Sequence, residues 1–149
     1  MIQDVRVTPL RQICDERGKV MHMLRADAPA FPGFGEIYFS TVFPGAIKGW
    51  HLQHRTTLNY AVPVGRIKLV LFDDRAESPT RGEVGEFFLG PDNYVLVTIP
   101  PLVWSGFKGI GTEMAVVANC ASMPHDPAAV QRLDPFDAKI PYNWALVHR

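Results

Sequence analysis

The amino-acid sequence predicts an all-β protein, and three observations support this prediction. Six short runs are rich in β-branched and aromatic residues, a composition typical of strands; they cover residues 36–43, 57–64, 66–74, 86–91, 93–100 and 113–120. The 13 prolines and 12 glycines supply turn formers between the runs, at spacings typical of a β-sandwich or barrel. Helix signals are weak and short, at residues 126–133 and near residues 26–31.

Turn-forming residues mark the ends of the predicted strands in chain order. Pro44-Gly45 follows the first run, Gly65 separates the second from the third, residues 90–93 join the fourth to the fifth, and residues 109–111 precede the sixth. After the last strand, Asp126 suits an N-cap and Pro127 suits the first helical position. No linker or internal repeat divides the chain, so we expect one domain over residues 1–149.

Composition and charge exclude several classes of partner. Fifteen basic residues balance fifteen acidic ones without a basic run, which argues against a nucleic-acid partner. No window approaches the roughly 20 apolar residues that span a bilayer, and the acidic N-terminal stretch does not fit a signal sequence. We therefore expect no membrane association and a cytoplasmic location. Cys14 and Cys120 lack CxxC spacing, and we expect reduced, buried thiols.

The segment from Gly45 to Gly65 keeps the spacing of a motif that binds metal in the cupin superfamily of β-barrels. That motif runs glycine, five residues, His, one residue, His, three or four residues, Glu, six residues, glycine. Its positions fall here on Gly45, His51, Gln53, Leu58 and Gly65. Only His51 is a strong metal ligand, so the spacing favours a cupin barrel without its metal.

The second half of the cupin motif has also lost its ligand, because Ser105 stands where a fourth ligand is expected. A transition metal normally takes three or four converging His, Cys or carboxylate ligands. His54 is a possible substitute, but on a strand it would face away from His51, three residues before it. We expect no metal, and a metal cupin that uses His51, His54 and an acidic residue from elsewhere remains an alternative.

Several local signatures occur along the chain in constant order: DERG at 15–18, KGWHLQ at 48–53, ESPT at 77–80, IPP followed by GF between 99 and 107, and DPFDAKIPYNW at 134–144. Together they resemble the dTDP-4-dehydrorhamnose 3,5-epimerase family, metal-free cupins of nucleotide-sugar biosynthesis. The resemblance implies a cupin jelly-roll β-barrel and a homodimer. It also implies a nucleotide-sugar substrate, no cofactor, and a place in polysaccharide biosynthesis.

The resemblance also implies a mechanism in which a His removes the proton next to the C4 ketone, a Lys stabilises the enolate, and a Tyr protonates the other side. The base is retained as His51, and a neutral imidazole suits this role. Counting without gaps, the Lys position becomes Leu58, a second His becomes Ser105, and the Tyr position becomes Ala118. The carboxylate that orients the family's base from the C-terminal tail has no counterpart.

Other residues of this chain are candidates to replace the lost groups. Tyr38 or Tyr60 is a candidate proton donor, and Lys48 or Lys68 is a candidate source of positive charge. Tyr60 and Leu58 should share one face of a regular strand. The alternative is that Tyr60 only packs in the core and that Lys68 is solvated.

Ligand binding requires well-placed donors, and Arg and Lys are suited to phosphate. Arg17 matches a substrate-contacting Arg of the family, and Lys48 replaces another Arg without its bidentate fork. Trp50 and Trp104 are candidates to stack on a base or sugar, with packing in the core as the alternative. The predicted substrate-binding residues are Arg17, Lys48, Gln53, Trp50, Trp104, Ser105 and Lys68.

We therefore expect a nucleotide-sugar epimerase or isomerase that acts on a dTDP-4-keto-6-deoxy sugar, or a related nucleotide sugar, by proton abstraction next to the ketone. His51, Tyr60 and Tyr38 are the predicted catalytic residues. The first alternative is a barrel that binds a nucleotide sugar or carbohydrate without epimerising it, which the lost Lys, Tyr and carboxylate favour. The second alternative is the metal-dependent cupin enzyme.

Overall fold

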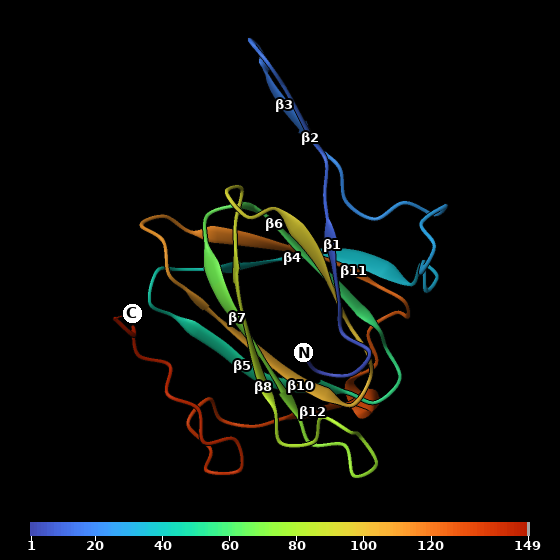
Figure 1. The fold of residues 1–149 in the computed structure, drawn as a ribbon, viewed down its shortest axis with the longest axis vertical. Coiled ribbons are helices and arrows are strands. Elements are labelled where there is room, and N and C mark those ends of the chain that lie inside the picture. Colours follow the sequence, from blue (N-terminus) through green and yellow to red (C-terminus); the bar gives the residue numbers. More distant parts are fainter. Residues whose placement is uncertain (149) are drawn as a thin grey trace.

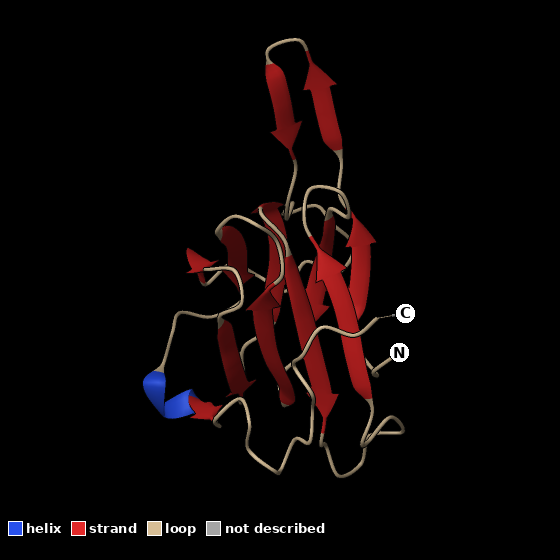
Figure 2. Cartoon of the chain, turned by 90° about the vertical axis from the view of Figure 1, so that its left-hand side faces the viewer, coloured by secondary structure: helices blue, strands red, loops and turns tan. Residues whose placement is uncertain are grey.

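The computed structural model describes residues 1–148, and within this range the protein is built almost entirely from strands (Figures 1 and 2). One five-stranded sheet has the spatial order β1 (Arg6–Pro9), β9 (Val95–Ile99), β6 (Leu58–Val64), β11 (Ala115–Ala121) and β4 (Glu36–Val42). The other has the order β12 (Val130–Arg132), β5 (Ile47–Gln53), β10 (Val103–Gly109), β7 (Ile67–Asp73) and β8 (Val84–Leu89). The predicted all-β jelly-roll barrel is confirmed.

A two-stranded hairpin, β2 (Gln12–Asp15) and β3 (Gly18–Met21), projects away from the barrel (Figures 1 and 2). Its apolar side chains Ile13 and Val20 are 41% and 59% exposed, although burial is their usual environment. Cys14 on β2 is exposed as well, which corrects the expectation of a buried thiol, whereas Cys120 on β11 is buried as expected.

The main core lies between the two large sheets. Every second residue of a strand points inward, so β6 contributes Leu58, Tyr60 and Val62, and the facing strand β7 contributes Ile67, Leu69 and Leu71. All six are at most 7% exposed. This packing closes one part of the barrel and leaves a cavity in another, where polar side chains replace the apolar ones.

A second apolar layer covers the outer face of the sheet that contains β5 and β10. The segment after β12 folds over this face and brings Ile140 and Trp144 against Trp50, Val70 and Trp104. The rings of Trp50 and Trp144 lie 5.0 Å apart, and both indole N–H groups donate to the carbonyl of Pro135, at 3.2 and 3.0 Å. The motif DPFDAKIPYNW thus forms a cover for the barrel.

The ESPT motif at 77–80 stabilises the loop between β7 and β8. The carboxylate of Asp73, which is 0% exposed, accepts hydrogen bonds from Arg75 Nε at 2.9 Å, Ser78 Oγ at 2.6 Å and Thr80 Oγ1 at 2.6 Å. Burial alone would raise the pKa of Asp73, but these hydrogen bonds outweigh burial and lower it below its usual range. The motif therefore has a structural role here.

The two predicted helices differ from the structure. Asp126 does act as an N-cap, accepting from the Ala128 N–H at 3.0 Å, but the 3₁₀ turn Pro127–Ala129 ends at once in β12. Residues 26–31 form turns without a helix. Helix formers such as Ala128 and Gln131 do follow Asp126, but residues 130–132 pair with β5, so strand pairing overrides the local preference, and Pro29 interrupts residues 26–31. Within residues 1–148 no helix has the length and apolar character needed to cross a membrane.

Candidate active site

A cavity of about 460 Å³ lies between the two large sheets, and polar side chains from both sheets line it. Strand β5 contributes His51 and Gln53, which its pleat directs inward, and Lys48, which reaches the same side because the pairing of β5 with β10 is irregular between Lys48 and His51. The facing sheet contributes Tyr38 from β4, Asn119 from β11 and Tyr60 from β6. The three residues predicted to act in catalysis therefore line one cavity.

The cavity residues form two cross-strand rows on facing sheets. In one sheet, His51 is the register partner of Arg132 on β12 and of Ser105 on β10. In the other sheet, Asn119 is the register partner of both Tyr38 and Tyr60. An imidazole thus occupies one wall and two phenols occupy the facing wall.

His51 is half-buried, and its environment favours the neutral imidazole. Burial lowers its pKa, and the positive charges of Arg132 and Lys48 lower it further. No side chain within residues 1–148 forms a hydrogen bond with the imidazole of His51. Because its pKa is lowered, the ring can accept a proton near neutral pH. The carboxylate that orients the base in the family has no counterpart beside His51 in the described part of the chain.

The two tyrosines differ in access to the cavity. Tyr60 is 7% exposed and packs edge-on against Phe107, with ring centres 6.1 Å apart. Burial raises the pKa of Tyr60, and the nearby Tyr38 raises it further. A hydrogen bond with Ser105 lowers the pKa by a smaller amount. Tyr38 is 39% exposed, and its hydroxyl oxygen accepts a hydrogen bond of 2.8 Å from Asn119 Nδ2.

Positive charge reaches the cavity from β5 and β12. Lys48 Nζ donates to Ser40 Oγ on β4 at 3.0 Å, so the ammonium group extends from one sheet toward the other. Arg132 lies beside His51 on the edge strand β12 and also lines the cavity. The positive charges of both side chains lower the pKa of His51.

The residues proposed as metal ligands do not converge. Within residues 1–148, no three His, Cys, Asp or Glu side chains lie close enough together to hold a metal ion. His54 follows the end of β5, where its backbone N–H donates to Ala129, and it does not line the cavity with His51. No observation therefore favours the metal-dependent alternative.

Comparison with known proteins identifies the family. A sequence model of the family described as dTDP-4-dehydrorhamnose 3,5-epimerase matches residues 1–149. The chain belongs to this family. The predicted family is thus confirmed, and with it the prediction of a nucleotide-sugar epimerase.

Individual known proteins are similar along nearly the whole chain. The probable low-salt glycan biosynthesis epimerase Agl13 of Haloferax volcanii is 34% identical, over 95% of this chain and 89% of the relative. The spore coat polysaccharide biosynthesis protein SpsL of Bacillus subtilis is 30% identical, over 97% of each. The crystal structure of a dTDP sugar isomerase from Desulfovibrio desulfuricans superposes with a TM-score of 0.95 and 45% identity, over 99% of this chain and 94% of that one.

Three residues predicted to bind the epimerase substrate lie on the opposite side of the sheet from the cavity. Trp50 and Trp104 are 0% and 2% exposed and belong to the outer apolar layer. Lys68 on β7 alternates with the inward-facing Ile67 and Leu69 and therefore points outward. Strand alternation places these three side chains away from His51, so none of them lines its cavity.

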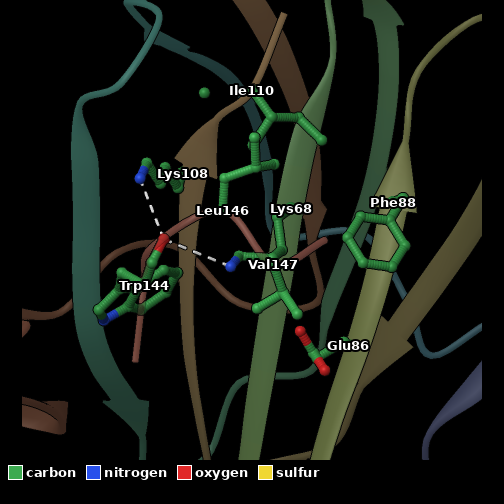
Figure 3. A pocket seen from close by; sticks show the side chains of 9 residues that line it. Lys68, Glu86, Phe88, Lys108, Ile110, Trp144, Leu146 and Val147 are labelled. Carbon is green, nitrogen blue, oxygen red and sulfur yellow. Dashed lines mark hydrogen bonds between the residues drawn. The ribbon is translucent and has the colours of Figure 1, made fainter. Parts of the chain in front are cut away.

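Lys68 instead lines a smaller pocket of about 220 Å³ under the C-terminal segment (Figure 3). Its ammonium group and that of Lys108 both point to the backbone carbonyl of Trp144, at 3.4 and 3.0 Å. The ammonium group of Lys68 also lies 5.0 Å from the ring centre of Tyr142. Lys68 is 5% exposed, so the alternative that it is solvated is wrong.

Ser105 and Arg17 also lie off the cavity surface of their own chain. Ser105 is 2% exposed and hydrogen-bonds to Tyr60 without lining the cavity. Arg17 lies in the turn of the β2–β3 hairpin, where its guanidinium pairs with Asp15 at 2.6 Å. Because the hairpin projects away from the barrel (Figure 1), Arg17 cannot contact the cavity of its own chain without a large movement.

Sequence reasoning missed Asn119, Arg132 and His125, all of which line the cavity. The gapless count placed the lost family Tyr at Ala118, but Ala118 pairs with Phe39 and Ala61 on the outer face. Its neighbour Asn119 is the residue that faces inward. A difference of one position along a strand moves a residue to the opposite face, so the count alone selected Ala118 on the outer face in place of the inward-facing Asn119.

Proposed function

We propose that this protein epimerises a dTDP-activated 4-keto-6-deoxy sugar at a carbon next to the ketone, with His51 as the base. The observation that carries the proposal is the placement of His51 on one wall of the cavity and of Tyr38 and Tyr60 on the facing wall. Inversion of a carbon requires removal of a proton from one face and its return to the other. Groups on opposite walls meet this requirement.

The proposed reaction proceeds in two proton transfers. The neutral imidazole of His51 removes the C–H proton next to the ketone, and the bonding electrons move into the carbonyl to give an enolate and an imidazolium. A tyrosine hydroxyl on the facing wall then protonates the same carbon from the opposite side, and the ketone re-forms. The imidazolium and the tyrosinate return to their starting states by exchanging protons with solvent.

In the family, a Lys at the position of Leu58 stabilises the enolate. In this protein Lys48 and Arg132 supply that positive charge. Both are cations beside His51, so they favour a negatively charged enolate and the diphosphate of a nucleotide sugar. One preorganised contact of this kind is worth about 3 kcal/mol, or about a hundredfold in rate. Gln53, which lines the cavity beside them, is suited to hydrogen-bond sugar or phosphate oxygens.

The hairpin supports a homodimer in which each copy completes the site of the other. An exposed hairpin with apolar residues on it needs a covering surface, and Arg17 at its turn cannot serve its own cavity. In a two-fold symmetric dimer the hairpin of one copy would reach the barrel of the other. The relatives in glycan and polysaccharide biosynthesis support the same pathway class here, in the cytoplasm, where nucleotide sugars are made.

A second candidate function is binding of the nucleotide sugar without epimerisation. Leu58 in the cavity and the lack of a carboxylate beside His51 within residues 1–148 favour this candidate. It predicts tight binding without any proton exchange at carbon, so the same experiment separates it from the enzyme.

The test is proton NMR of the protein with dTDP-4-keto-6-deoxyglucose in deuterated water, with the His51→Ala variant as control. The expected result is loss of the C3 or C5 proton signal and formation of an epimer with the wild type only. Line broadening of the ligand without exchange would favour binding alone. Exchange at the wild-type rate in His51→Ala would overturn the role of His51.

A further inference from the structure

Asn119 lies between the two candidate proton donors and has its amide group fully oriented by the structure. It is 1% exposed and is the cross-strand partner of both Tyr38 and Tyr60. Its Oδ1 accepts from the backbone N–H of Asn59 at 3.2 Å, and its Nδ2 donates to the hydroxyl of Tyr38 at 2.8 Å.

The oxygen and the nitrogen of the Asn119 amide cannot exchange places. A backbone N–H only donates, so the oxygen of Asn119, and not its nitrogen, must face Asn59. The side chain of Asn59 is held in turn, because its Nδ2 donates to the Cys120 carbonyl at 3.1 Å and its Oδ1 accepts from Thr98 Oγ1 at 2.8 Å. The N–H of Asn119 is therefore directed at Tyr38.

This arrangement determines what the hydroxyl of Tyr38 can do. An amide N–H cannot accept a hydrogen bond, so the oxygen of Tyr38 accepts from Asn119 and its own O–H proton must point elsewhere. Tyr38 is open to the cavity, whereas Tyr60 is 7% exposed and hydrogen-bonds to Ser105. When Tyr38 gives up its proton, the N–H of Asn119 is already aimed at the resulting oxyanion.

We propose that Asn119 is a positioning residue that makes Tyr38, and not Tyr60, the acid that protonates the enolate. The inference rests on the proposed function and identifies which of the two tyrosines completes the inversion. In this role Asn119 does not contact the substrate. It acts by leaving the Tyr38 proton available to the cavity and by stabilising the tyrosinate that forms.

The deciding variant is Asn119→Asp, which preserves the shape of the side chain and the acceptor for Asn59. A carboxylate cannot donate to Tyr38, so the Tyr38 proton would turn toward residue 119 and leave the cavity. Removal of the acid leaves the base intact, so His51 should still exchange the substrate proton with deuterated solvent. We expect exchange within about fivefold of wild type and inversion reduced about a hundredfold.

Two tyrosine variants make the assignment specific. Tyr38→Phe should reproduce Asn119→Asp, with exchange retained and inversion lost, whereas Tyr60→Phe should invert at least about tenfold faster than Tyr38→Phe. The double variant Tyr38→Phe with Asn119→Asp should be no slower in inversion than Tyr38→Phe alone, because both changes remove the same proton transfer. Thermal unfolding of each variant checks that the fold is retained.

The readout is the ratio of deuterium exchange to epimer formation, measured by NMR with dTDP-4-keto-6-deoxyglucose. A merely structural role for Asn119 would lower exchange and inversion together, and that outcome overturns the proposal. Wild-type inversion in Asn119→Asp, or loss of inversion in Tyr60→Phe instead of Tyr38→Phe, overturns it as well. A wild-type protein that neither exchanges nor inverts rejects the proposed function, and the role of Asn119 falls with it.

Discussion

His51 and Tyr38 line the same cavity from opposite sheets, although they lie on consecutive strands, β5 and β4. The corner between these strands makes this possible. Gly45 adopts a positive φ of 81° there and its N–H donates to Gly109 at 2.8 Å, so the chain turns from one sheet into the other. The imidazole of His51 and the phenol of Tyr38 thus line one cavity because a short corner joins their strands.

The pH dependence of the reaction should report the environment of His51. Its pKa is lowered, so the neutral base persists to lower pH than an ordinary His would allow, and kcat/KM should fall only as pH drops through that lowered value. Arg132→Gln removes one of the charges that lower the pKa, so the acidic limb should move to higher pH. The measurement is a pH profile of kcat/KM.

Arg55→Gln is the matched control for this profile. Arg55 is a surface residue paired with Asp126 at 2.9 Å, and it does not line the cavity. Its profile should coincide with that of wild type. An Arg132→Gln profile that shows no shift, or a shift to lower pH, would contradict the assignment of the limb to His51.

Two lysine variants distinguish the cavity from the outer face of the same sheet. Lys48→Met removes a cation beside His51 and should lower kcat/KM about thirtyfold, the effect of about 2 kcal/mol from one charged contact. Lys68→Met should leave kcat/KM within about twofold, since the side chain lies under the C-terminal segment. Steady-state kinetics of both variants measure this, and equal losses would show that the outer pocket affects the reaction.

Asp73→Asn should destabilise the protein, because the carboxylate is buried and accepts several hydrogen bonds. We expect a loss of about 2–3 kcal/mol in the free energy of unfolding at neutral pH. The folded state lowers the pKa of Asp73, so its stabilisation is present above the unfolded value of about 3.9 and is lost as pH falls further. The difference between wild type and variant should therefore shrink in acid.

Chemical denaturation at several pH values measures this difference. Asp92→Asn is the matched control, because Asp92 forms a surface ion pair with Arg66 at 3.6 Å and is 64% exposed. It should cost at most about 0.5 kcal/mol. A difference for Asp73→Asn that grows in acid would contradict the linkage derived from its hydrogen bonds.

The sequence predicted the sheet fold well because strand composition and turn residues act locally. The run at 36–43 became β4 and the run at 57–64 became β6, within a residue or two. Strand β10 was missed, since its glycines at 106 and 109 lower strand propensity while the fold needs them for close approach. A Cβ on Gly106 would lie 3.2 Å from Gly49, and one on Gly109 would lie 2.5 Å from the Phe43 carbonyl.

The site was predictable only in part, for a physical reason. His51 and Gln53 were found from motif spacing, and the shared face of Leu58 and Tyr60 followed from strand alternation. Trp50 and Trp104 were misplaced because an aromatic side chain next to a motif residue on a strand points to the other face. Asn119 and Arg132 become site residues only through pairing between strands distant in sequence, which no local pattern encodes.

Arg17 provides a test of the proposed dimer. Arg17→Ala should raise KM about tenfold, since an Arg contact with a phosphate is a charged hydrogen bond worth about 1.5 kcal/mol. His51→Ala should be inactive. If the hairpin of one copy completes the site of the other, a mixed dimer of the two variants holds one site with both defects and one intact site.

Co-expression of the two variants with different affinity tags isolates this mixed dimer. We expect about half of the wild-type kcat per dimer, with the wild-type KM, because one of two symmetric sites is restored. Arg17 acting within its own chain would leave the mixed dimer with the raised KM of Arg17→Ala. A protein that elutes as a monomer in size-exclusion chromatography and still epimerises its substrate would reject the dimer. The kinetics of the mixed species thus separate a hairpin that crosses between copies from one that folds back.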